Sequence, residues 1–206
     1  MKIKFLKTIF LLALSSSVLT SCVGDDDYVI PTVYRYAFNE GFETSTTGSG
    51  SNEVAIALEG WVNYNATGTR LWHARTFDSN IYAEFSSFYS ATGTNDATWL
   101  ITPALDLTAT TGEVLSFTTK TRFTNGYPLT VFISTNYDGT TAGIATATWT
   151  PIVFTAPTAN DVFVNSGNID LSSYENSNVR IAFKYTGSKA GVTTTLQLDN
   201  VKITKN

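Results

Sequence analysis

The feature of this chain that most constrains its fold is a strict alternation of apolar and polar side chains in the segment 179–185. Its odd-numbered residues are all apolar, while its even-numbered residues include two cations. The two sets are Val179, Ile181, Phe183 and Tyr185 against Arg180, Ala182 and Lys184. Successive side chains of a β-strand point to opposite faces, so this pattern predicts a strand with one buried and one exposed face.

Similar strand signals recur along most of the chain. They predict strands at 33–42, 61–64, 70–77, 81–85, 98–101, 113–122, 129–135, 148–154, 179–185 and 194–203. Leu115, Phe117 and Phe123 are predicted to mark the buried side of their segment. Turn residues separate the strands, as in Asp78-Ser79-Asn80. No segment holds a helical period over three turns. The sequence therefore predicts an all-β fold, a two-sheet antiparallel jelly-roll sandwich.

The last predicted strand carries an irregularity at its centre. Leu196 and Leu198 share one parity, whereas Val201 and Ile203 share the other. One extra residue shifts the register of a strand and moves the following side chains to the opposite face. We therefore expect a β-bulge at 199–200, which would redirect the side chain of Asp199.

The first 21 residues have the composition of a cleaved secretory signal. Lys2, Lys4 and Lys7 precede an apolar stretch and then small residues. That stretch is too short to span about 30 Å of hydrocarbon. The remaining 185 residues suffice for one domain, expected at 33–206. These 185 residues contain all 17 acidic residues and only ten of the 13 basic ones, so their net charge is −7. Such an acidic chain is a poor partner for nucleic acid.

The only cysteine, Cys22, directly follows Leu19-Thr20-Ser21. This sequence resembles the lipobox of bacterial lipoproteins, in which the cysteine carries a diacylglycerol and its new amino end an acyl chain such as palmitate. Two or three such chains anchor a protein stably, since each buried methylene contributes about 0.8 kcal/mol. A secretory signal with a stray cysteine is the simpler alternative.

Cys22 and the residues after it, 22–32, are predicted to form a tether. Its acidic run, Asp25-Asp26-Asp27, resembles the export tag of certain Gram-negative lipoproteins. The resemblance implies an outer-membrane protein that is held by its lipid and faces the cell exterior. A merely solvated linker is the alternative.

Several motifs follow one another along the rest of the chain. In order they are Phe38-Asn39-Glu40-Gly41-Phe42-Glu43, Gly60-Trp61, Trp72, Trp99-Leu100-Ile101-Thr102-Pro103, Leu115-Ser116-Phe117 and Leu198-Asp199-Asn200-Val201. Over 36–203 they resemble the choice-of-anchor J or cleaved-adhesin type of domain, and within it a domain family of unknown function on surface lipoproteins of glycan-scavenging bacteria. The resemblance implies a jelly roll akin to carbohydrate-binding modules and to MAM domains, with no established ligand.

The same resemblance implies a structural calcium ion between the first and last strands. The matching carboxylates are Glu43 and Asp199, with Asp96 as a candidate third. Calcium takes six to eight oxygen ligands, including backbone carbonyls, so a few carboxylates suffice. The simpler alternative is that these are strand-end acids that accept hydrogen bonds from turn amides.

Catalytic chemistry is not indicated. His73 is the only histidine, and no Gly-x-Ser-x-Gly motif offers it a nucleophile. One cysteine and one histidine cannot form a zinc cluster. The Glu-x-Asp-x-x-Glu pattern of laminarinase-like jelly-roll enzymes does not occur. The sequence predicts a protein that binds and does not catalyse.

The chain is rich in aromatic residues, which sugar-binding modules stack on pyranose faces beside a few polar groups. Trp61, Trp72 and Trp99 are assigned to packing, and Trp149 is left open. The candidate ligand-binding residues are Tyr127 and Tyr137 in turns, then Tyr64 and Tyr89, with the outward cations Arg122, Arg180 and Lys184. For each of them an ordinary surface side chain is the simpler alternative.

These observations together predict a monomeric surface module that binds a polysaccharide or a host glycan. The alternative is an adhesin or structural surface protein, which would bind a protein partner or assemble by strand addition at an exposed sheet edge.

Overall fold

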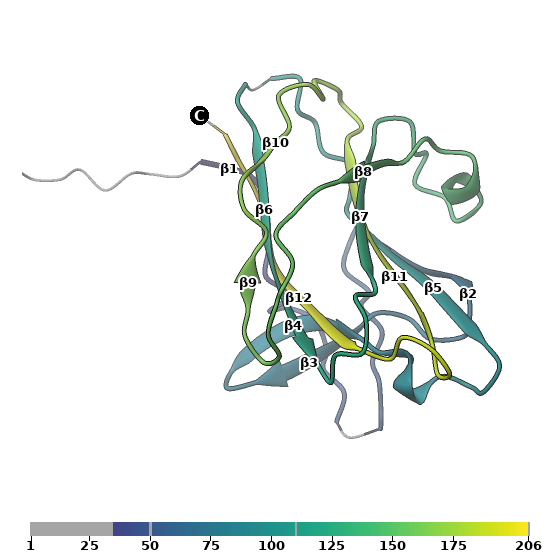
Figure 1. The fold of residues 1–206 in the computed structure, drawn as a ribbon. Helices are drawn as coiled ribbons and strands as arrows, with labels where there is room; N and C mark the ends of the chain where they lie inside the picture. The colour runs from purple at the N-terminus through teal and green to yellow at the C-terminus, as the bar shows by residue number, and fades with distance from the viewer. Residues whose placement is uncertain (1–34, 50, 110, 206) are drawn as a thin grey trace, which may run out of the picture. The chain divides into compact units, whose positions relative to one another are not determined.

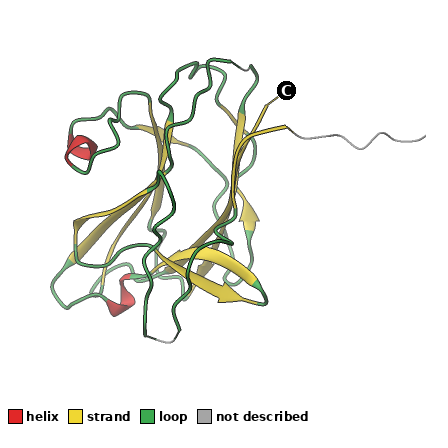
Figure 2. Ribbon diagram, turned by 180° about the vertical axis from the view of Figure 1, so that it is seen from behind, coloured by secondary structure: helices red, strands yellow, loops and turns green. Residues whose placement is uncertain are grey.

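The computed structural model describes residues 35–49, 51–109 and 111–205. They form two antiparallel sheets packed face to face, which confirms the predicted all-β jelly-roll sandwich (Figures 1 and 2). Cys22 and the tether 22–32 lie outside the described residues. Within the described part of the chain, no helix is long and apolar enough to cross a membrane.

The larger sheet, sheet A, has seven strands. They are β1 (Arg35–Glu40), β3 (His73–Phe77), β4 (Asn80–Phe85), β6 (Val114–Arg122), β9 (Val164–Asn165), β10 (Ile169–Asp170) and β12 (Thr195–Lys205). The main order is β10-β6-β12-β4-β3, with β1 beside β12 and β9 beside β6. The long strand β12 is central because β4 pairs with its first half and β1 with its second half, both on the side opposite β6.

The smaller sheet, sheet B, has five strands in the order β2-β5-β11-β7-β8. Their bounds are β2 (Val62–Thr67), β5 (Asn95–Ile101), β7 (Leu129–Ser134), β8 (Thr150–Ile152) and β11 (Arg180–Ser188). Two short 3-10 helices lie in connections between strands: η1 (Ser87–Tyr89) between β4 and β5, and η2 (Ala142–Ala145) between β7 and β8. The segment with η2 stands on the side of sheet B that faces away from sheet A (Figures 1 and 2).

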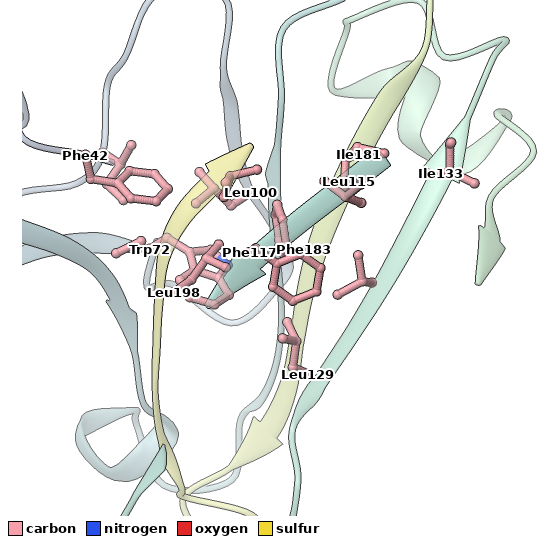
Figure 3. Packing of buried hydrophobic residues seen from close by; sticks show 14 of the residues in the cluster. Phe42, Trp72, Leu100, Leu115, Phe117, Leu129, Ile133, Ile181, Phe183 and Leu198 are labelled. Carbon is pink, nitrogen blue, oxygen red and sulfur yellow. The ribbon is translucent and has the colours of Figure 1, made fainter. Parts of the chain in front are cut away.

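The core lies between the sheets and comes from the alternating apolar residues. The inward side chains of β6 and β11 include Phe117 and Phe183, whose ring centroids are 5.2 Å apart in a T-shaped contact. Figure 3 shows these rings among the buried aliphatic residues of both sheets. Period-two alternation thus predicted the inward residues Leu115 and Phe117 of β6 and the inward face of β11 correctly.

Each of the ten predicted segments overlaps a strand of the structure. The two-residue strands β9 and β10 were not predicted, because two residues are too few to show a period. Phe123 was predicted to be buried, and this was wrong: its side chain is 74% exposed. It follows β6 with a φ of 52°, and this break from the extended backbone ends the alternation.

The predicted bulge in β12 is present. The register of β12 against β6 shifts between Asp199 and Lys202, and Asn200 has a φ of 53°. Leu198 before the shift and Val201 after it are therefore both in the core. Asp199 takes the opposite parity to Leu198 and lies on the outer side of sheet A.

Candidate functional site

Cross-strand pairing places a row of polar side chains on the outer face of sheet A. His73 on β3 pairs with Glu84 on β4, and Glu84 pairs with Gln197 on β12. Gln197 pairs in turn with Lys120 on β6. Paired residues of neighbouring strands share a face, so these four side chains cross the sheet side by side.

A hollow of about 470 Å³ lies on this face and is called here the sheet A groove. It is lined by Phe77, Asp78, Asn80, Tyr82, Thr118, Lys120, Phe163, Asp199 and Asn200. The ring of Phe77, at the tip of the β3–β4 hairpin, is 71% exposed. The Lys120 Nζ atom lies 4.5 Å from the ring centroid of Phe163 and 6.0 Å from that of Phe77. The groove therefore combines an open aromatic face with a cation.

Asp199 is the buried carboxylate of the sheet A groove. Its Oδ2 atom accepts a hydrogen bond from Asn80 Nδ2 at 3.0 Å, and its Oδ1 atom accepts one from the backbone N–H of Asn200 at 2.6 Å. Burial, reinforced by the charge of Glu43, raises the pKa of Asp199. On Lys120, burial and the nearby Arg122 lower the pKa of the ammonium group.

A cluster of charges lies beside the groove, on β3, β4 and the chain before β3. The His73 ring is buried, with its Nε2 atom 3.7 Å from Glu53 Oε1 and 3.6 Å from Glu84 Oε1. Arg70 pairs with Glu53, and the Arg75 Nε atom lies 3.7 Å from Glu84 Oε1. Each carboxylate thus faces a guanidinium group, so the cluster is internally compensated.

The structure brings together two of the three predicted calcium ligands. Gly41 lies between them, since a Cβ atom on it would be 3.8 Å from Glu43 Cγ and 4.0 Å from Asp199 Oδ1. Glu43 also accepts a hydrogen bond from the backbone N–H of Ile81 at 3.3 Å. The pair has no ion pair with a cation within 4.0 Å among the described residues, and backbone oxygens would have to complete a calcium site there.

Asp96 does not join this pair. It lies on β5 in sheet B, where its Oδ2 atom accepts hydrogen bonds from the hydroxyls of Ser87 and Ser90. Among the described residues, no group of three or more His, Cys, Asp or Glu side chains is placed to hold a metal ion. The prediction of Asp96 as a third ligand of the same site is therefore corrected: its role is to hold the turn around η1.

Four of the residues predicted to bind a ligand, Tyr127, Tyr137, Tyr64 and Arg122, do not converge on one site. Tyr137 is fully buried, which overturns the expectation that a ring beside a turn stands free. Tyr127 is 38% exposed, and burial of its hydroxyl raises its pKa to about 12. Tyr64 is half-buried on the outer face of sheet B. Arg122 lies on sheet A, where its Nε atom donates to Asp161 Oδ1 at 2.6 Å.

The outer face of sheet B carries an aromatic cluster that the chain itself covers. Trp149 lies 5.3 Å from Trp99 and 5.2 Å from Tyr137 between ring centroids, so this tryptophan packs. Trp99 is only 7% exposed as a result. The cation of Lys184 lies 4.8 Å from the Trp99 ring centroid. The segment 135–149 thus occupies the ring faces that a ligand would need.

The residues that sequence reasoning missed are the aromatic and cationic residues of the sheet A groove, Phe77, Lys120 and Phe163. Phe77 precedes the turn Asp78-Ser79-Asn80, so the criterion applied to Tyr127, a large ring beside a turn, would have found it. Lys120 and Phe163 gave no such signal, because their proximity depends on the pairing of distant strands.

Comparison with known proteins supports the fold. No protein-family model and no curated protein sequence matches the chain. Among solved structures, the K3 cleaved adhesin domain of Lys-gingipain from Porphyromonas gingivalis W83 matches with a TM-score of 0.52 and 18% identity, over 84% of this chain and 100% of that domain. The K1 cleaved adhesin domain of the same protein matches with a TM-score of 0.50 and 18% identity, over 82% and 98%.

A xylan-binding CBM22-1 domain of Xyn10C from Paenibacillus barcinonensis matches with a TM-score of 0.45 and 12% identity, over 84% of this chain and 96% of that one. Likeness at these identities concerns the fold and does not transfer a ligand. Placement in the choice-of-anchor J group or its lipoprotein family stays a prediction. The chain has the jelly-roll fold of cleaved adhesin domains.

Proposed function

We propose that this protein is a non-catalytic surface module that binds a polysaccharide in the sheet A groove. The observation that carries the proposal is the 71% exposed ring of Phe77 at the border of that groove. An exposed aromatic ring is costly in water and gains from contact with the apolar face of a sugar.

The polar groups of the groove suit sugar hydroxyls. The amide of Asn80 uses its nitrogen on Asp199, which leaves its oxygen as an acceptor. The ammonium of Lys120 is a donor, and it makes no ion pair within 4.0 Å among the described residues. A few oriented polar groups beside an aromatic surface are the usual composition of a sugar site.

Two further expectations belong to the proposal. Cys22 would carry the lipid that holds the module at the outer membrane, with 22–32 as the tether. Glu43 and Asp199 would hold a structural calcium ion, since a divalent cation would relieve the repulsion that contributes to the raised pKa of Asp199. Such an ion would hold the Asp199 carboxylate in place, and this carboxylate accepts the hydrogen bond that orients the Asn80 amide. Asp199 would then act through Asn80 and would not itself contact the sugar.

The alternative function is protein adhesion through the sheet edges. Edge strand β8 is three residues long and contains Pro151, which cannot donate to an added strand. Edge strand β2 has a register shift between Asn65 and Thr67. Both features oppose strand addition at the two edges of sheet B, and glycan binding is the function that we favour.

The test is binding of the purified chain to soluble xylan, mannan, laminarin, mixed-linkage β-glucan and host glycosaminoglycans, by affinity electrophoresis and calorimetry. We expect at least one polysaccharide to bind, with loss of affinity in Phe77→Ala. Tyr36→Ala is the matched control, because this ring is 48% exposed and outside the groove. The proposal would be contradicted if the folded protein binds none of these probes. It would also be contradicted if the Phe77→Ala variant binds with the same affinity as wild type.

A further inference from the structure

Three more aromatic side chains stand exposed near the other end of the β3–β4 hairpin from Phe77. Phe88 and Tyr89 of η1 are 58% and 70% exposed, and Phe123 after β6 is 74% exposed. Together with Thr193 and Thr195 they line a hollow of about 310 Å³, called here the η1 hollow. Neither the core nor the sheet A groove accounts for so many exposed rings in one place.

The two exposed rings of η1 lie on a stretch of backbone that buried hydrogen bonds hold in place. Ser87 and Ser90, which flank them, donate their hydroxyls to the buried Asp96 Oδ2 at 2.5 and 2.6 Å. The backbone N–H of Ser87 donates to the hydroxyl of Tyr185 at 3.3 Å, itself fully buried. A ring on an ordered backbone loses less conformational entropy on binding than one on a free loop. This scaffold is therefore suited to a binding surface.

The Phe123 side chain points outward because its backbone adopts a strained conformation. Its φ of 52° is in the left-handed region that bulky residues rarely adopt. Such strain persists only where the surrounding structure enforces it, and it concentrates at binding sites. The guanidinium group of Arg122 lies 5.3 Å from the Phe123 ring centroid, so one side of the ring is already ordered.

The η1 hollow and the sheet A groove lie along one strand. Thr195 lines the first and Asp199 the second, four residues apart on β12, which is about 13 Å at the rise of a strand. A third hollow of about 350 Å³ lies beside them, lined by Ser51, Glu53, Arg70, Arg75 and Tyr89. It shares Tyr89 with the η1 hollow, and its Arg75 pairs across β3 and β4 with Tyr82 of the groove.

We propose that the η1 hollow is a second sugar subsite, so that the ligand is an extended internal stretch of a polysaccharide and not a single terminal sugar. The inference rests on the proposed function of the groove. Phe88, Tyr89 and Phe123 supply apolar faces at one end, Phe77 supplies one at the other, and the polar residues between them face the hydroxyls of the intervening units. Threonine hydroxyls at positions 193 and 195 complete the second subsite.

The test is a length series read by calorimetry on the full chain. The probes are xylo-, cello-, manno- and laminari-oligosaccharides from two to six units, with wild type, Phe77→Ala and the double variant Phe88→Ala/Tyr89→Ala. We expect the affinity for the six-unit form of the bound sugar to exceed that for the two-unit form by tenfold or more. Both variants should weaken six-unit binding by about fivefold or more.

Each outcome bears on a different claim. If Phe77→Ala weakens binding while Phe88→Ala/Tyr89→Ala does not, the groove stands and the second subsite is overturned. Equal affinity for two and six units overturns the extended ligand. Absence of binding by every probe overturns the proposed function and this inference with it. Thermal melts of both variants establish folding, which is expected to be intact because the substituted rings are mostly exposed.

Discussion

Replacement of Phe77 by alanine separates binding from folding, because its ring belongs mostly to the surface. Full burial of a phenylalanine side chain contributes about 1.5–3 kcal/mol. With 71% of the residue exposed, a ligand that covers it can gain roughly 1–2 kcal/mol. The share already buried in the fold is worth less than about 1 kcal/mol. The loss of affinity should therefore exceed the loss of stability.

At about 1.4 kcal/mol per tenfold change, Phe77→Ala is expected to raise the Kd for the bound polysaccharide roughly 6- to 30-fold. Isothermal titration calorimetry measures the change, and a urea melt measures the accompanying stability. Tyr36→Ala, on β1, should leave the Kd within twofold of wild type. A Kd for Phe77→Ala within twofold of wild type, or an equal loss in Tyr36→Ala, would refute the assignment of the groove.

Three further predictions concern the supporting structure. Calcium at about 100 times its Kd should raise the melting temperature by roughly 5–10 °C relative to the melting temperature in excess chelator. If wild type and Glu43→Gln each melt at the same temperature with calcium as with chelator, the site is excluded. The raised pKa of Asp199 means that the folded state binds the proton of this carboxyl more tightly than the unfolded state. In excess chelator, the wild type should therefore gain stability relative to Asp199→Asn as the pH falls from 7 toward 4. A stability difference between the two proteins that does not change with pH would contradict this prediction. Gly68→Ala should destabilise by about 1–3 kcal/mol in urea melts, because φ is +88° and a Cβ would lie 2.3 Å from Asp96 Oδ1. Gly93→Ala is its control, with a φ of +84° and open space, and equal costs would argue against the contact with Asp96.

The fold was predictable from the sequence wherever a strand is half buried. The alternation in 179–185 specified β11 and its inward face, since burial of one face requires a period of two. The parity change between Leu198 and Val201 predicted the bulge for the same reason. Both inferences use only local pattern, and the core enforces that pattern.

The candidate site was less predictable because its residues converge through distant pairings. Phe77, Lys120 and Phe163 come from β3, β6 and the connection before β9. No local rule gives the order of strands in a sheet, so no local rule places these side chains together. Tyr137 failed for a related reason: the turn that carries it folds back on sheet B, and long-range packing outweighs the local tendency of turns to be exposed.

The two outer faces of the sandwich explain why the tryptophans were a poor guide to the site. On sheet B, Trp99 and Trp149 cover each other, so the largest rings of that face are removed from water by the chain itself. On sheet A, the centre of the face is polar and internally compensated, and it offers little driving force for the chain to cover it. Exposed rings stand at both ends of this polar centre, at Phe77 and around η1. A ligand that gains from both ends must be long enough to cross the polar centre, and a polysaccharide, with apolar ring faces and hydroxyl edges along its whole length, has that chemistry.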